Sequence, residues 1–226
     1  MTEPSDLPTA PADALRPEPG DCLVLIDLQP DFMEGGALAV PDGAAVVPIV
    51  NRLIPHFAHV VASQDWHPAG HSSFASEHPG RAPFETVEMP YGPQVLWPDH
   101  CVQGTPGAAL HGDLDTDRLD LILRKGTRRT LDSYSAFREN DGTTSTGLAG
   151  YLRERGLSRL FFAGLATDFC VGWSVEDARR AGFVAVLIDD ACRAIDLDGS
   201  LAAARARMAA AGARATTAAA LSEIRR

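Results

Sequence analysis

The chain has 226 residues, which is enough for one α/β domain with a substantial core. Its 30 acidic and 20 basic residues give a formal net charge of −10, and such an acidic surface disfavours nucleic acid and anionic membranes as partners. The four cysteines, Cys22, Cys101, Cys170 and Cys192, are widely spaced and form no CxxC pair. This spacing predicts reduced thiols in a cytoplasmic protein rather than a disulfide scaffold.

The N-terminal residues differ in composition from the rest of the chain. Five prolines fall within residues 1–20, where large hydrophobic side chains are few. This composition predicts a flexible leader over residues 1–19 and a single domain over residues 20–226. Because no apolar stretch approaches the ~20 residues needed to span a bilayer, the sequence predicts no membrane anchor.

Short apolar runs predict six strands, at residues 21–26, 59–63, 120–124, 159–163, 183–188 and 213–217. Helical patterns occur at residues 43–57, 146–155, 171–181 and 198–211. Residues 72–104 are rich in proline, glycine and histidine, and they are predicted to form a long loop. Strands that alternate with helices predict an α/β fold, with a parallel sheet covered on both faces.

Reactive side chains follow four of the predicted strands. Asp27 comes after the first strand, Asp65 after the second, Lys125 after the third, and the segment 166–170 after the fourth. The C-terminal ends of parallel strands meet at one edge of a sheet, where α/β proteins bind their ligands. We therefore expect these groups to converge on one site.

Cys170 is the candidate nucleophile. It follows an apolar run and begins an amphipathic pattern, which predicts a place in the first turn of a helix. The helix dipole and Lys125 are expected to lower the pKa of the thiol, and Asp27 could accept its proton. Taken singly, the three residues have structural alternatives: a buried thiol, a turn carboxylate and a solvated lysine. Their convergence at one edge favours catalysis.

A second pattern combines one carboxylate with three imidazoles. Asp65, His67 and His71 lie within seven residues of one another, and His100 follows 29 residues later. Such donors suit a divalent ion such as zinc, iron or manganese. The alternative is a group of surface loop histidines, and Cys101 is a minor alternative ligand.

Aromatic residues gather in the loops near the same strand ends. Phe32, Trp97, Tyr134 and Phe137 could wall a pocket for a planar ring. The alternative is that they anchor loops to the core, which we prefer for Phe137. Neither GxGxxG nor GxxxxGK[ST] occurs, so nucleotide binding has no motif support.

Five motifs occur in order along residues 20–220. They are Ile26-Asp27-Leu28-Gln29-Pro30-Asp31-Phe32, Gln64-Asp65-Trp66-His67-Pro68 followed by His71, Trp97-Pro98-Asp99-His100-Cys101, Lys125-Gly126, and Gly164-Leu165-Ala166-Thr167-Asp168-Phe169-Cys170-Val171. Together they resemble the nicotinamidases (pyrazinamidases) of the isochorismatase-like cysteine hydrolases. The resemblance implies one isochorismatase-like hydrolase domain over residues 20–226. Its fold would be a three-layer α/β/α sandwich with a six-stranded parallel sheet of order 3-2-1-4-5-6.

The resemblance also implies a role for each candidate residue. Asp27 would be the proton acceptor, Lys125 its charged partner and Cys170 the nucleophile. One divalent ion (Zn²⁺, Fe²⁺ or Mn²⁺) would be bound by Asp65, His67, His71 and His100. The substrate pocket would be formed by Phe32, Leu38, Trp97 and Tyr134. A cis peptide between Leu165 and Ala166 would aim the amides of Ala166 and Cys170 into an oxyanion hole.

The implied activity is the hydrolysis of nicotinamide to nicotinate and ammonia through a thioester, with the metal orienting the pyridine ring. Two alternatives stay open: hydrolysis of another small amide or N-carbamoyl compound, and a metal- or ligand-binding protein without turnover. Isochorismate hydrolysis is disfavoured, since it needs neither the cysteine nor the metal ligands. The expected partner is a small molecule, and the oligomeric state is open, a homo-oligomer included.

Overall fold

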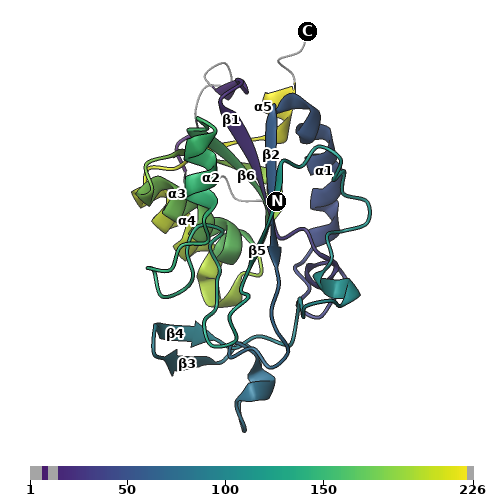
Figure 1. The fold of residues 1–226 in the computed structure, drawn as a ribbon, viewed down its shortest axis with the longest axis vertical. Helices are drawn as coiled ribbons and strands as arrows, with labels where there is room; N and C mark the ends of the chain where they lie inside the picture. Colours follow the sequence, from purple (N-terminus) through teal and green to yellow (C-terminus); the bar gives the residue numbers. More distant parts are fainter. Residues whose placement is uncertain (1–6, 10–14, 223–226) are drawn as a thin grey trace.

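The computed structural model describes residues 7–9 and 15–222. Within these residues, a central sheet is covered by helices on both faces in a three-layer α/β/α arrangement (Figure 1). The strands are β1 (Asp21–Ile26), β2 (His59–Asp65), β3 (Thr86–Met89), β4 (Gly92–Val95), β5 (Leu121–Lys125), β6 (Arg159–Leu165), β7 (Val184–Arg193) and β8 (Arg214–Thr216). The helices are α1 (Val46–Leu53), α2 (Leu148–Glu154), α3 (Gly172–Arg180), α4 (Ser200–Ala210) and α5 (Ala218–Ser222).

The central sheet contains six of the described strands, in the order β5-β2-β1-β6-β7-β8. Every pair in it is parallel. Numbered within the sheet, this order is 3-2-1-4-5-6, so the predicted fold is confirmed. Val24 of β1 lies opposite Val61 of β2 and Phe162 of β6. The strand order reverses between β1 and β6, which is where an open α/β sheet leaves a ligand-binding crevice.

Alternate strand residues build the two cores, one on each face of the sheet. Leu25 packs with Val50 of α1 on one face, and Val24 packs with Leu152 of α2 and Val175 of α3 on the other. All of these side chains are at most 1% exposed. Burial of an aliphatic side chain contributes about 1.5–3 kcal/mol relative to its exposure to water. The continuous apolar runs of the sequence follow from this burial on both faces.

One predicted helix is shorter in the structure than its sequence pattern. Residues 43–57 form a 3₁₀ turn at Gly43–Ala45, then α1, then a second 3₁₀ turn at Ile54–His56. Pro55 lacks an N–H donor and its ring clashes with the preceding helical turn, so the α-helix ends at Leu53. The other three helical patterns match α2, α3 and α4 to within two residues at each end.

The prediction of a loop over residues 72–104 is wrong in part, because this region contains the β3–β4 hairpin. The two strands pair antiparallel, with Met89 opposite Gly92 and Val87 opposite Gln94. Each strand has only four residues, too few for a clear alternation of apolar and polar residues. Pro93 also makes β4 hard to predict from the sequence, since proline is uncommon within strands.

The predicted leader, residues 1–19, falls largely on residues 1–6 and 10–14, which lie outside the described residues. Its described parts contact the domain. Leu7 and Leu15 are each 2% exposed, and Thr9 forms a parallel bridge with Ala215 of β8. These short parts therefore contribute to the packing of the domain.

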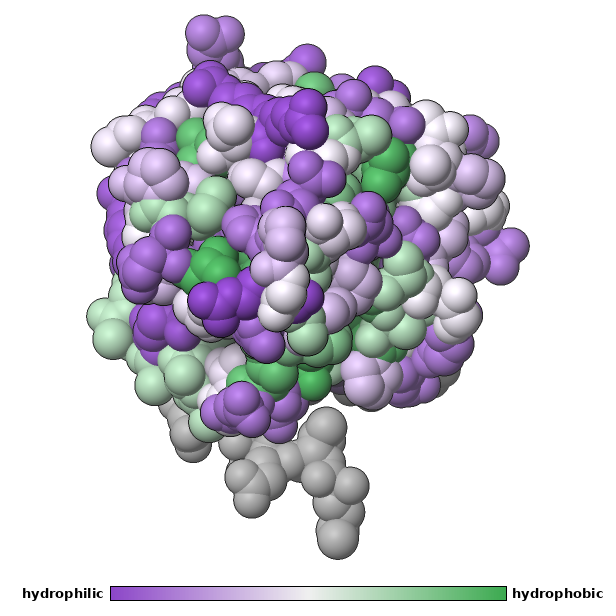
Figure 2. All heavy atoms as spheres, turned by 90° about the horizontal axis from the view of Figure 1, so that it is seen from below, coloured by the Kyte–Doolittle hydropathy of each residue, from purple (hydrophilic) through white to green (hydrophobic). Residues whose placement is uncertain are grey.

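The surface at the end that carries β3 and β4 is mainly hydrophilic, with small hydrophobic areas between polar side chains (Figure 2). Among the described helices, none is long and apolar enough to cross a membrane.

Cys22 should make the protein sensitive to alkaline pH. Burial raises the pKa of this thiol from 9.0 to about 12. The folded state therefore favours the neutral thiol. Its stabilisation of the fold is fully present below pH 9 and is lost as the pH rises toward 12. Between pH 8 and pH 10.5 this loss is about 2 kcal/mol. We expect Cys22→Val to reduce the alkaline decline in the free energy of unfolding by that amount, measured by urea denaturation at both pH values. An equal decline in both proteins would contradict this assignment.

Candidate active site

The site is centred on the ammonium group of Lys125, at the end of β5. Its Nζ lies 2.9 Å from Asp27 Oδ2, 3.0 Å from Asp65 Oδ1 and 3.4 Å from Cys170 Sγ. It also donates a hydrogen bond of 2.9 Å to the carbonyl oxygen of Ser133. Burial by itself lowers the pKa of Lys125, but the Asp27 and Asp65 carboxylates outweigh it and hold the pKa well above the ordinary value. Lys125 is therefore a buried cation, and three strand ends meet on it as predicted.

The two carboxylate oxygens of Asp27 differ, because one accepts a hydrogen bond and the other does not. Oδ1 accepts a 2.6 Å hydrogen bond from Ser63 Oγ. Oδ2 lies beside Lys125 but accepts no hydrogen bond with suitable geometry from any described residue. Burial raises the pKa of Asp27, and Lys125 opposes that rise. A buried carboxylate with a raised pKa and an open acceptor position is suited to accept a proton.

Ser63 was not selected from the sequence, although a signal for it was available. β1 and β2 are parallel, and Leu25 lies opposite Ala62. The next residue of β2, Ser63, therefore lies beside the end of β1, within reach of Asp27. Strand register would have indicated this hydroxyl once the pairing of the two strands was assumed.

Cys170 lies in a π-helical turn, Thr167–Val171, directly before α3. The sequence predicted the first turn of an α-helix. The turn is wider than an α-helical turn because the amide of Val171 donates to the carbonyl of Ala166, five residues earlier, at 3.1 Å. Burial raises the pKa of the Cys170 thiol well above its ordinary value, and Lys125 only partly offsets this. The predicted lowering of the thiol pKa is wrong, so the thiol keeps its proton until a base removes it.

Asp65, His67 and His100 form a compact group, whose ligand atoms all lie within 4.8 Å of one another. The Nε2 atoms of His67 and His100 lie 3.0 Å and 3.4 Å from Asp65 Oδ2. Their Nδ1 atoms lie 3.0 Å and 2.8 Å from the carbonyl oxygens of Gly126 and Pro98. A neutral imidazole that donates from Nδ1 to a carbonyl presents the lone pair of Nε2 to a metal. The donor set therefore fits a divalent cation.

His71 belongs to a second group, which shares His67 with the first and adds Asp132. Its Nδ1 lies 2.7 Å from Ser73 Oγ, and its Nε2 lies 3.3 Å from the carbonyl of Leu131. The structure thus brings all four predicted ligands together, with His71 joined to the others through His67. Asp132 is 2% exposed and was missed, because a single aspartate in an irregular loop carries no sequence signal.

The backbone and the neighbours of residue 126 require a glycine directly after Lys125. Its φ of +64° is in the left-handed region, and a Cβ there would lie 2.5 Å from Cε1 of His67. A side chain at this position would displace the imidazole that both ligand groups share. The pair Lys125-Gly126 therefore sets the position of an ammonium and of a histidine at once.

The four predicted pocket residues all line one small cavity beside Cys170: Phe32, Leu38, Trp97 and Tyr134. Asp132, Phe169 and Ile195 also line it, although no motif in the sequence indicated a pocket position for them. Trp97 and Phe169 meet edge to face, with ring centroids 4.8 Å apart. The free volume is about 20 Å³, room for about one water molecule.

The peptide bond between Leu165 and Ala166 is cis, as the resemblance implied. It lies at the end of β6, immediately before the turn that carries Cys170. Ala166 lines the same cavity as Cys170. The backbone of this segment thus borders the space next to the thiol.

The sequence of this chain matches a known protein family and known members of it. A family model described as the isochorismatase domain matches residues 21–220. The chain belongs to the isochorismatase family. A nicotinamidase from Acinetobacter baylyi is 53% identical over 190 residues, which cover 84% of this chain and 89% of that protein. A nicotinamidase from Escherichia coli is 44% identical, over 86% of this chain and 93% of that protein.

Solved structures of the family superpose well on this chain. A nicotinamidase/pyrazinamidase from Acinetobacter baumanii has a TM-score of 0.89 at 49% identity, covering 90% of this chain and 99% of that one. PnC1 from L. infantum, in complex with nicotinate, has a TM-score of 0.80 at 40% identity, covering 91% and 97%. A pyrazinamidase from Pyrococcus horikoshii, in complex with zinc, has a TM-score of 0.71 at 35% identity, covering 88% and 99%.

Metal binding at this site can be tested directly. After dialysis against zinc, we expect the wild-type protein to retain one ion per chain, measured by elemental analysis. His100→Asn should weaken binding by more than the ~10–100-fold that loss of an outer partner causes, because it removes a ligand itself. His111→Asn, outside both groups, is the control. Equal zinc retention by all three proteins would exclude the site.

Proposed function

We propose that this protein hydrolyses nicotinamide to nicotinate and ammonia, with Cys170 as the nucleophile. The observation that carries the proposal is the buried Lys125 ammonium, which contacts Asp27, Asp65 and Cys170. Asp65 and Cys170 in turn line the aromatic pocket. A protonated thiol, a nearby carboxylate and a fixed cation are the parts that covalent amide hydrolysis needs. The nicotinamidases at 53% and 44% identity support this choice of substrate, as does the nicotinate in the L. infantum structure.

The first half of the reaction forms a thioester. Asp27 Oδ2 takes the proton of Cys170 Sγ, and the thiolate attacks the carboxamide carbon. The resulting oxyanion accepts hydrogen bonds from the backbone amides of Ala166 and Cys170. Asp27 then gives its proton to the amide nitrogen, the C–N bond breaks, and ammonia leaves. Throughout, the Lys125 charge stabilises whichever of the two partners is anionic.

The second half uses the same groups on water. Asp27 takes a proton from a water molecule, and the hydroxide adds to the thioester carbon. Collapse of this intermediate breaks the C–S bond and releases nicotinic acid, while the thiolate takes back the proton held by Asp27. The nicotinic acid gives its carboxyl proton to the released ammonia, so the products are nicotinate and ammonium and each group of the protein ends in its starting state.

Asp65, His67 and His100 would hold a divalent metal, with His71 and Asp132 beside them. We infer zinc, iron or manganese from the donor types, and zinc has support from the P. horikoshii structure. A metal bound there would supply a positive charge that attracts the pyridine nitrogen, directly or through water. Phe32, Leu38, Trp97 and Tyr134 would hold the faces and edges of the ring and exclude water from the thioester.

Replacement of the nucleophile tests the proposal. Cys170→Ala should abolish ammonia release from nicotinamide, because no other group can form the thioester, while zinc content stays unchanged. Cys192→Ala, a buried thiol outside the cluster, should remain active. Parallel assays with pyrazinamide and N-carbamoyl compounds decide between the nicotinamide and alternative-amide hypotheses. Ammonia release by Cys170→Ala at the wild-type rate would refute the mechanism.

Ser63 should act as a positioning residue for Asp27. Ser63→Ala removes the 2.6 Å hydrogen bond to Asp27 Oδ1, and we expect kcat to fall on the order of tenfold. The bond lowers the pKa of Asp27, so its loss should also shift the acid limb of the pH–rate profile to higher pH. Ser63→Thr, which keeps the hydroxyl, is the matched control. An unshifted acid limb in Ser63→Ala would argue against this role.

A further inference from the structure

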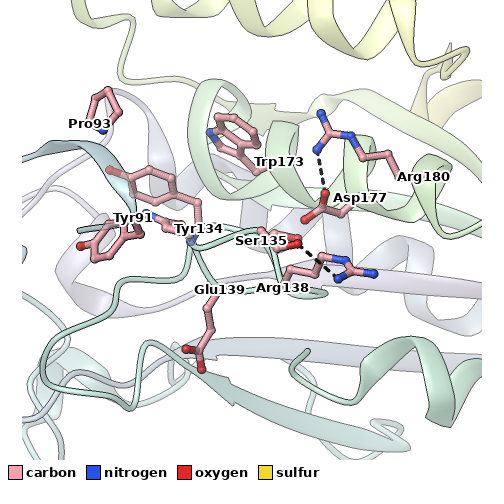
Figure 3. Close-up of a pocket in the computed structure, with 11 residues that line it drawn as sticks. Tyr91, Pro93, Tyr134, Ser135, Arg138, Glu139, Trp173, Asp177 and Arg180 are labelled. Carbon is pink, nitrogen blue, oxygen red and sulfur yellow. Dashed lines mark hydrogen bonds and ion pairs between the residues drawn. The ribbon is translucent and has the colours of Figure 1, made fainter. Parts of the chain in front are cut away.

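A larger cavity lies next to the catalytic pocket. It has a volume of about 400 Å³, against about 20 Å³ beside Cys170. Its walls come from the β3–β4 hairpin, from the loop after β5 and from α3, and they include Tyr91, Tyr134, Arg138, Trp173 and Arg180. Figure 3 shows the three aromatic side chains gathered on one side of this space and the two arginines on the other. A volume of this size is in the range of small-molecule sites.

Most of the charges around the cavity are paired. Arg180 contacts Asp177 at 2.9 Å and Glu176 at 3.3 Å. Glu139 lies 3.3 Å from Arg128, and in Figure 3 its carboxylate points away from the aromatic side chains. Glu176 is also paired with Arg207, at 2.9 Å, so these contacts together leave no net charge.

Arg138 is the exception. Its Nη1 donates to the carbonyl oxygens of Gly142 and Thr143, at 3.2 Å and 3.4 Å. It forms no ion pair with an acidic side chain in the part of the chain that the structure describes. The cavity therefore has one positive charge without a counterion. A guanidinium in this state is suited to a carboxylate, which it can bind through two parallel hydrogen bonds.

We propose that this cavity is a second binding site, for a small aromatic monocarboxylate, and that its occupation inhibits the catalytic pocket. Tyr91, Tyr134 and Trp173 offer faces and edges for a planar ring, and Arg138 offers the charge for one carboxylate. The product of the proposed reaction, a pyridine carboxylate, belongs to this class. The inhibitory role rests on the proposed function, whereas the binding site does not.

Tyr134 connects the two spaces, because it lines both. Its hydroxyl accepts hydrogen bonds from Gln94 Nε2 at 2.9 Å and from Trp97 Nε1 at 3.2 Å. Gln94 is 0% exposed. It also donates to Asp132 at 2.8 Å and accepts from Tyr91 at 3.2 Å. A wall of the larger cavity is thus linked, through one buried amide, to the substrate pocket and to the metal-ligand cluster.

The direction of the effect follows from the volumes. The space beside Cys170 holds about one water molecule, so a ring with a carboxamide enters only if a wall moves. Tyr134 is the wall residue with open space behind it, in the larger cavity. A ligand in that cavity takes up the space and opposes the movement. Substrate and cavity ligand therefore weaken each other's binding, by the same factor in both directions.

Benzoate is the probe for the binding test, by calorimetry on the full-length protein. Arg138→Gln should weaken benzoate binding on the order of tenfold, as expected for loss of a charge-assisted hydrogen bond. Trp173→Leu, on the opposite wall, should also weaken it, and thermal melting shows that each variant is folded. Arg118→Gln replaces an exposed arginine outside the cavity and should bind as the wild type does. Unchanged affinity in both cavity variants overturns the proposal.

The kinetic test measures ammonia release from nicotinamide at rising benzoate concentrations. We expect the apparent KM to rise to a plateau in the wild type and in Arg118→Gln, and to rise less in Arg138→Gln. A KM that rises without limit, and equally in all proteins, means that benzoate binds only beside Cys170 and overturns the inhibitory role. If no protein releases ammonia, the proposed function fails, while the calorimetry still decides whether the second site exists.

Discussion

The buried ammonium of Lys125 is the interaction on which the site depends. It contacts the carboxylate that follows β1, the carboxylate of the last residue of β2, the carbonyl of Ser133 and the thiol before α3. Two carboxylates buried this closely are tolerated only with a cation between them, and breaking a buried ion pair typically costs about 3–5 kcal/mol. The same contact therefore stabilises the fold at the strand ends and fixes the distances between the reacting groups. The ion pairs of Lys125 therefore serve both the stability of the fold and the chemistry of the site.

Much of the site could be predicted because it lies at strand ends. Asp27, Asp65, Lys125 and Cys170 each follow an apolar run that forms a strand, and parallel topology brings such positions together. The protonation state of Cys170 could not be predicted, because it depends on burial that opposes the nearby charge. Ser63 required the register of β1 and β2. Gln94 and Asp132 lie on a short hairpin and an irregular loop, where residue type alone carries no positional information.

These less predictable residues form the polar network that joins the parts of the site. Gln94 uses its amide to bind Asp132 and Tyr134, and its oxygen accepts from Tyr91 and Asn140. Buried amides with this many partners have few alternative positions, since each lost hydrogen bond leaves an unsatisfied polar group. The network thus connects the aromatic wall to the metal-ligand cluster through hydrogen bonds, although they come from distant parts of the sequence.

The contact between the N-terminal residues and β8 has a consequence beyond packing. β8 is the last strand of the sheet and has only three residues. The amide of its central residue, Ala215, donates to the carbonyl of Pro8 at 3.2 Å, next to the bridge with Thr9. An open sheet edge is a template on which another chain can add a strand. Pro8 and Thr9 occupy part of that template, so they hinder strand addition at the β8 edge of the sheet.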